Sequence, residues 1–141
     1  MPELDERQDI SKFVEAVGAV EPPANDESYM TFRHIFKRHN YFVLEGRFLI
    51  VKVSRSDRPF WGVGKKFIDL LNGLNDYYLV LLVSSSEGWV FSKAEVMVNI
   101  RNLEWKLRGT DNNYKINPPL PNRNAFANPK TFRKMIGINE S

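Results

Sequence analysis

The sequence predicts an α/β (α+β) protein in which a central mixed sheet is flanked by helices. Residues 47–53 and 77–83 are almost continuously apolar, as expected for strands that are buried on both faces. A pattern with helical spacing, residues 62–74, lies between these two runs. Because a helix between two buried strands indicates a crossover within one sheet, Ile50 and Leu81 are expected in central strands of the same sheet.

The N-terminal part of the chain predicts two helices joined by a loop. Residues 9–17 carry apolar side chains at helical spacing on one face, namely Ile10, Phe13, Val14 and Val17. Gly18 and a proline-containing segment then end this helix. Ser28 can cap a second helix that continues to about residue 38.

Turn and capping signals define the remaining elements. Glu45 and Gly46 form a tight turn between strands at 41–44 and 47–53. A short strand at 89–91 precedes Ser92 and Glu95, whose spacing gives a capping box for a helix to about residue 102. Two short strands are expected near 103–107 and 114–116, and a last helical turn near 131–135.

This pattern predicts that the chain is divided into three segments. Residues 1–27 form an acidic helix and linker, residues 28–116 form the α/β core, and residues 117–141 form a tail rich in proline and asparagine. With 141 residues, the chain has the length of one domain.

Charge is distributed unevenly along the chain. Residues 1–28 carry eight acids and two bases, a net charge of −6, whereas residues 29–141 carry nine acids and eighteen bases, a net charge of +9. A small basic body attracts polyanions, and nucleic acid is the commonest of these. An acidic protein partner is the alternative.

Several classes of protein do not fit the sequence. The absence of cysteine excludes disulfides, thiolate zinc sites and a cysteine nucleophile, and no metal site is expected. The longest apolar run is too short to span a bilayer, and the acidic N-terminus is unlike a signal peptide. The expected location is therefore cytoplasmic, nucleoid or nuclear.

The segment from His39 to Ser54 resembles the core of restriction-endonuclease-like, or PD-(D/E)xK, nucleases. The shared features are the order helix, strand, tight turn, strand, helix, strand over residues 28–100 and a lysine, Lys52, before a polar loop. In that family, an acid on each of two hairpin strands binds Mg²⁺, and the lysine helps to activate or position the attacking water. The resemblance implies a nuclease-like core.

The metal-binding acids of that family are missing here. Asn40 stands at the position of the first acid and Ile50 at that of the second, so only Lys52 matches. Mg²⁺ prefers anionic oxygen ligands, which neither residue supplies. Glu27, Glu45 or Asp69 could supply a relocated acid, and Asp69, on the following helix, is the substitute that we name. Mg²⁺ would then be the cofactor; otherwise no cofactor is expected. The alternative for Lys52 is a strand lysine whose head reaches water.

Basic and aromatic residues after the lysine strand form a candidate nucleic-acid site: Arg55, Arg58, Trp61, Lys65 and Lys66. Trp61 could stack on a base, or it could be a core residue that fixes the start of the next helix. Lys65 and Lys66 follow glycines at an expected helix start, where an anion could bind.

These observations favour a nucleic-acid-associated protein with a degenerate nuclease core, such as a non-catalytic subunit or regulator. An active nuclease with a rearranged acid and a protein-interaction domain are the alternatives, since one fold hosts many functions.

Overall fold

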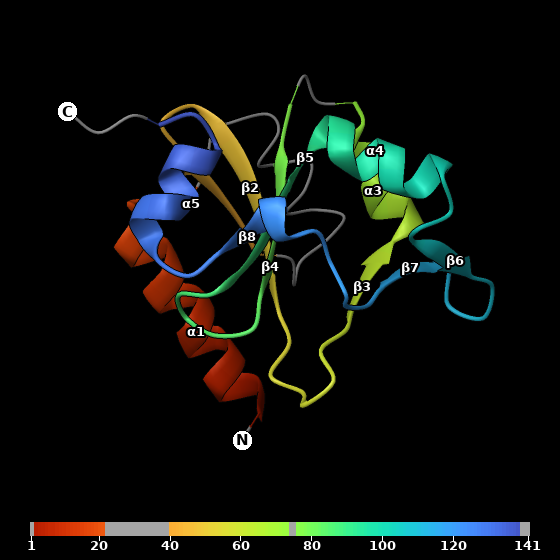
Figure 1. The fold of residues 1–141 in the computed structure, drawn as a ribbon, viewed down its shortest axis with the longest axis horizontal. Helices are drawn as coiled ribbons and strands as arrows, with labels where there is room; N and C mark the ends of the chain where they lie inside the picture. The colour runs from red at the N-terminus through yellow and green to blue at the C-terminus, as the bar shows by residue number, and fades with distance from the viewer. Residues whose placement is uncertain (1, 22–39, 74–75, 139–141) are drawn as a thin grey trace.

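The structure, a computed structural model, describes residues 2–21, 40–73 and 76–138 (Figure 1). The helix expected from Ser28 to residue 38 lies outside these residues. The larger sheet contains β1 (Asn40–Leu44), β2 (Arg47–Val53), β4 (Tyr78–Leu82), β5 (Gly88–Ser92) and β8 (Ala125–Phe126). The smaller sheet contains β3 (Trp61–Gly64), β6 (Lys106–Arg108) and β7 (Asn113–Ile116). The helices are α1 (Pro2–Val17), α3 (Lys65–Leu71), α4 (Lys93–Arg101), α5 (Pro129–Met135) and the 3₁₀ turn η1 (Asn122–Asn124).

The mixed central sheet predicted from the sequence is present. Its strands lie in the order β1-β2-β4-β5-β8, and β2 and β4 are parallel while the other neighbours are antiparallel. Ile50 pairs with Leu79, and Lys52 pairs with Leu81. Ile50 and Leu81 therefore occupy adjacent central strands, which confirms the expectation from the two apolar runs.

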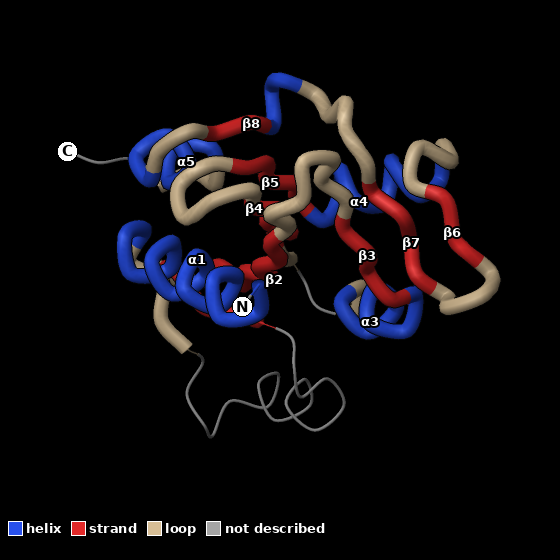
Figure 2. Tube along the Cα trace, turned by 90° about the horizontal axis from the view of Figure 1, so that it is seen from below, coloured by secondary structure: helices blue, strands red, loops and turns tan. Residues whose placement is uncertain are grey.

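Different elements cover the two faces of the five-stranded sheet. Leu49 and Val51 belong to the core shared with α1 and α5, whereas Ile50 belongs to the core shared with α3, α4 and the smaller sheet. This division follows from the alternation of side chains along a strand. Figure 2 shows α1 and α5 on one side of the molecule and β3, β7 and β6 on the other.

The helix expected over residues 62–74 is shorter than predicted and begins at Lys65. Residues 61–64 instead form β3, whose Trp61 and Val63 are buried and alternate with Gly62 and Gly64. Two glycines weaken a helix, and pairing with β7 supplies the strand with hydrogen-bond partners. The prediction was wrong here because β7, the strand with which residues 61–64 pair, lies some fifty residues later in the sequence.

The turn between β1 and β2 has the conformation that its sequence indicates. Glu45 and Gly46 both have positive φ angles, of 46° and 81°. Two successive residues with positive φ are typical of the tight hairpin turn that matches strand twist.

The C-terminal segment contributes to the core as well as to the surface. Phe126 of β8 and Phe132 of α5 pack against Phe13 of α1, with ring centroids 5.7 and 4.9 Å from that of Phe13. Helix α5 agrees with the predicted last turn, while β6 begins three residues later than the strand expected at 103–107. Leu103 has a φ of 60°, a turn conformation that delays the strand. None of the helices described has the length and apolar character needed to cross a membrane.

Candidate nucleic-acid interface

The smaller sheet places several basic side chains on one face. Lys106 pairs directly with Lys115, which in turn pairs with Gly62. Arg108 and Asn113 form the pair two positions further along the strands. Directly opposed residues, and residues two apart on one strand, project from the same side of a sheet. We call these four outward side chains, Lys106, Arg108, Asn113 and Lys115, the basic sheet face.

The opposite side of the same sheet is packed into the protein. Trp61, Val63 and Ile116 lie there and are almost completely buried. The basic sheet face is thus the side that remains for contact with a partner. In Figure 2, β6 forms the outer edge of this sheet, next to β7.

An exposed aromatic ring adjoins the basic sheet face. The side chain of Phe60, the residue before β3, is 48% exposed. The Nζ of Lys115 lies over this ring, 4.5 Å from its centroid. A cation above an aromatic ring is attracted by its negative face, and the pair offers both charge and a flat apolar surface to a ligand.

The positive charge of the face is partly balanced at one end. Arg108 donates from Nη2 to Asp111, at 2.7 Å, in the turn between β6 and β7. This hydrogen bond from Arg108 is the main cause that holds the pKa of the Asp111 carboxyl below its usual value. Lys106 and Lys115 lie at the other end, so that end carries the stronger positive potential.

Two of the predicted binding residues, Lys65 and Lys66, lie beside this face. Both are exposed in the first turn of α3, and the backbone N–H of Lys65 donates to Asn112 in the turn between β6 and β7. The side chain of Lys65 bonds to Asp69 at 2.8 Å, which raises the pKa of Lys65. Helix α3 thus extends the basic region beyond the sheet.

The remaining predicted binding residues have different environments. Arg58 is exposed on the loop before Phe60. Arg55 donates two hydrogen bonds, of 2.6 and 2.8 Å, to the buried carboxylate of Asp9 on α1. Trp61 is 2% exposed and donates from its indole nitrogen to the Leu82 carbonyl, in agreement with the interpretation of this ring as a core residue.

The residues that resemble a nuclease site do not form a set of carboxylates. Asn40 begins β1, where its backbone pairs with Val51, and Ile50 is fully buried. The Nζ of Lys52 donates to the Gly62 carbonyl at 3.1 Å, and burial lowers the pKa of Lys52. Asp69 is exposed and its carboxylate is paired with Lys65.

No three histidine or acidic side chains of the described residues come together in a group that could hold a metal ion. A comparison of the chain with protein-family models, curated proteins and solved structures found no significant match.

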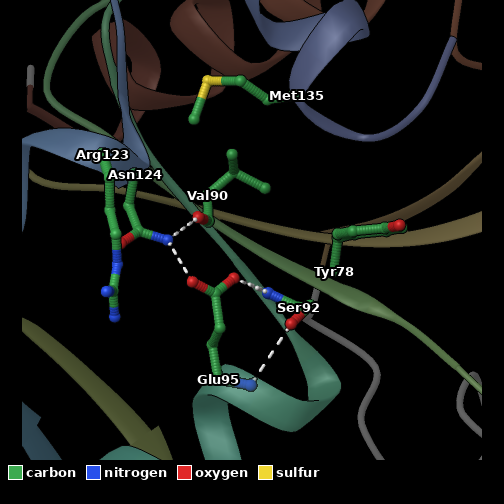
Figure 3. A pocket seen from close by; sticks show the side chains of 7 residues that line it. All are labelled: Tyr78, Val90, Ser92, Glu95, Arg123, Asn124 and Met135. Carbon is green, nitrogen blue, oxygen red and sulfur yellow. Dashed lines mark hydrogen bonds between the residues drawn. The ribbon is translucent and has the colours of Figure 1, made fainter.

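A pocket with polar and apolar walls lies near the start of α4 (Figure 3). The side chains that line it include Ser92, Glu95, Arg123 and Asn124, and Asn124 is 3% exposed. A larger pocket shares Glu95, Arg123 and Asn124 and extends along α4 to Trp105. Its volume of about 690 Å³ is within the usual range for small-ligand sites.

The sequence did not point to several residues of the basic sheet face and of the pockets near α4: Phe60, Lys106, Arg108, Asn113, Lys115, Arg123 and Asn124. A signal for the basic sheet face was present, because the alternation of basic and apolar residues around Leu107 and Tyr114 places the bases on one side of a strand. No comparable local signal marks Asn124, whose burial depends on contacts with β5 and α4.

Proposed function

We propose that this chain binds single-stranded nucleic acid across the basic sheet face and does not cleave it. The observation that carries the proposal is the projection of Lys106, Arg108 and Lys115 from one side of an exposed sheet, with the Phe60 ring beside Lys115. Basic side chains that follow the phosphates and an aromatic ring that stacks on a base are the two features that sequence-tolerant single-strand binding uses.

A single strand fits this surface better than a duplex does. The Phe60 ring is half exposed and can meet the face of a base only when that base is unstacked. In a duplex, the bases are stacked on one another, and only charge would remain for recognition. Lys65, Lys66 and Arg58 extend the positive charge around the sheet, so a bound strand has further phosphate contacts at either end.

The test measures the affinity of the protein for fluorescent 12-nucleotide single strands of DNA and RNA and for a duplex, by anisotropy at several salt concentrations. Changing Lys106, Arg108 and Lys115 together to Ala should weaken single-strand binding at least tenfold. It should also reduce the slope of log affinity against log salt by about 2, since each lost phosphate contact in a single strand contributes about 0.7.

A matched control removes the same charge elsewhere. Lys12, Lys130 and Lys134 are exposed on α1 and α5, on the other side of the five-stranded sheet. Their joint change to Ala should alter affinity much less. Equal weakening by both triple variants would show that only net charge matters. A wild-type protein that binds none of the three nucleic acids at low salt would contradict the proposal and favour an acidic protein partner.

The second part of the proposal, that the chain does not cleave nucleic acid with Mg²⁺ or Mn²⁺, is based on the residues at the family's metal positions. Ile50 offers no ligand atom and is fully buried, and the Asp69 carboxylate is already paired with Lys65. Divalent cations need several oxygen ligands. Cleavage by the purified protein that is lost in both Asp69→Ala and Lys52→Ala would overturn this part and support a rearranged active site.

A further inference from the structure

The side-chain amide of Asn113 lies across the outward side of β3. Asn113, on β7, pairs with Gly64, and Lys115, two residues later on the same face, pairs with Gly62. A Cβ atom at Gly64 would lie 3.4 Å from Asn113 Oδ1, and one at Gly62 would lie 3.6 Å from Asn113 Nδ2. The two glycines therefore leave, above β3, the space that this amide occupies.

The fold does not use this amide as a hydrogen-bonding group. Its two polar atoms bond to nothing in the part of the chain that the structure describes, and neither is among the buried atoms that lack a partner. Asn99 and Asn128 differ, because Asn99 donates to the Glu95 carbonyl and Asn128 caps α5. Both polar atoms of the Asn113 side chain are thus open to a ligand.

The exposed Phe60 ring lies at one end of this amide. Phe60 precedes Gly62 by two residues, about 7 Å of extended chain. The Nζ of Lys115, the partner of Gly62, lies over the ring, and Arg108 is paired with Asn113 on the other side. Because Gly62 has no side chain, nothing on β3 separates the ring from the amide. Ring and amide are neighbours on one surface, between two positive charges.

An asparagine amide matches the edge of a base better than it matches a phosphate. The amide presents an acceptor and a donor side by side. On the edge used for Watson–Crick pairing, each base also has an N–H donor next to an acceptor, and this edge is free in a single strand. A phosphodiester offers acceptors alone. A base edge therefore satisfies both polar atoms of Asn113, whereas a phosphate satisfies only Nδ2.

We propose that Asn113 binds the pairing edge of the base that stacks on Phe60; this inference rests on the proposed function. The amide oxygen accepts from the N–H of the base, and the amide nitrogen donates to the neighbouring acceptor. Since the described residues give the amide no hydrogen bond, it can turn over and fit either order of donor and acceptor. The contact thus requires a base, accepts each base, and excludes a duplex, whose pairing edges are already bonded to each other.

The test replaces Asn113 by Leu, which has nearly the same shape and no polar atoms. The affinity for dA12, dC12 and dT12 should fall about tenfold in each case, the effect of one or two hydrogen bonds. The affinity for an abasic strand of twelve units and for a duplex should not change, since neither offers a free base edge. The slope of log affinity against log salt should also keep its wild-type value, because no phosphate contact is lost.

Two further variants complete the test. Asn122→Leu makes the same change at an exposed asparagine of η1, beside the larger sheet, and should bind every strand like the wild type. Gly62→Val fills the space between the Phe60 ring and the amide and should weaken dT12 binding at least as much as Asn113→Leu does. Its melting temperature should not fall, because valine suits a strand better than glycine does.

The outcomes separate this inference from the proposed function. Weaker abasic-strand binding or a smaller salt slope in Asn113→Leu would show that the amide contacts a phosphate, and a loss with only one of the three oligonucleotides would show that it selects a base; either result would overturn the inference. Unchanged affinity in Asn113→Leu, or in Gly62→Val at the wild-type melting temperature, would overturn it and leave the proposed function, provided that the joint change of Lys106, Arg108 and Lys115 weakens binding. A wild-type protein that binds no strand would refute both.

Discussion

Arg55 connects the loop after β2 to helix α1 through a half-buried ion pair. Asp9 is 4% exposed, and both of its carboxylate oxygens accept from the Arg55 guanidinium. Arg55→Ala would leave this carboxylate buried without the guanidinium, so we expect a loss of about 2 kcal/mol in the free energy of unfolding. Urea denaturation measures the loss.

Arg58→Ala provides the control for this prediction, because Arg58 is exposed on the same loop and should change stability by less than about 0.5 kcal/mol. In a double-mutant cycle with Asp9→Ala, the stability losses of the two single variants should sum to much more than the loss in the double variant. Additive losses would mean that the pair contributes nothing. Nucleic-acid affinity should stay within about twofold in Arg55→Ala, since its charge is already paired with Asp9.

Lys52 makes the stability of the protein depend on alkaline pH. Burial lowers the pKa of its amine below the usual value of about 10.4, and the hydrogen bond to Gly62 does not reverse this. At pH values below its folded-state pKa, Lys52 is charged in the folded and in the unfolded protein. The folded protein then bears the full cost of desolvating this charge. As pH rises from that pKa toward 10.4, only the unfolded chain keeps the proton, and the contribution of Lys52 to stability improves.

Lys52→Met should therefore raise the melting temperature at pH 7, by about 4 °C for each kcal/mol gained. This advantage should shrink as pH increases through the alkaline range, as calorimetry at several pH values would reveal. Lys12→Met, at an exposed position on α1, is the matched control and should show neither effect. A lower melting temperature for Lys52→Met at pH 7 would mean that the bond to Gly62 outweighs the desolvation of the charge.

Among the elements, α4 has the most clearly defined start. The capping box satisfies the backbone N–H groups of Ser92 and Glu95. Ser92→Ala should cost about 1 kcal/mol, the usual cost of losing a cap. Glu95→Ala should cost more, roughly 2 kcal/mol, because it also removes the acceptor of a hydrogen bond from buried Asn124.

Urea denaturation of the two variants distinguishes these roles, with Ala94→Gln, at the exposed position beside them, as the control. Equal costs for Ser92→Ala and Glu95→Ala would mean that Glu95 acts only as a cap.

Elements whose determinants are local were predicted from the sequence, and those that depend on distant partners were not. The buried strands β2 and β4 and the Ser92 capping box are each encoded within a few consecutive residues of the sequence. The four residues of β3 are too few for a period-2 pattern to be distinguished from the start of a helix, and their partner β7 follows much later. The basic sheet face was not predicted for the same reason, since only the pairing of β6 with β7 brings Lys106 next to Lys115.

Over the whole molecule, the acidic helix α1 and the basic sheet face lie on opposite sides of the five-stranded sheet, and α5, beside α1, carries three bases and no acid. Helix α1 carries five acids and two bases in its sequence, and it packs on one face of the five-stranded sheet. The basic sheet face belongs to the layer on the other side, and Figures 1 and 2 both place α1 and β6 far apart. A polyanion is thus repelled by α1 and attracted toward β6 and β7, and this steering should weaken as salt increases.

Helix α1, near the start of the chain, and β8 and α5, near its end, pack into the same hydrophobic core. Phe13 of α1, Phe126 of β8 and Phe132 of α5 are in mutual ring contact, and Phe132 is fully buried. Phe132→Ala would remove a ring that touches both other elements and should cost about 3–5 kcal/mol. That is a large part of the total stability of a domain of this size, which is usually 5–15 kcal/mol.

Deletion of residues 117–141 would remove β8 and α5 together and expose the apolar face of α1, so we expect the remaining chain to lose cooperative unfolding. Differential scanning calorimetry should show a lower transition temperature for Phe132→Ala and no transition for the deletion, while Lys130→Ala, an exposed change on the same helix, should match the wild type. A shortened chain that still unfolds in one sharp transition would show that residues 1–116 fold without the tail. In that case, the packing of Phe132 against Phe13 would contribute little to the fold.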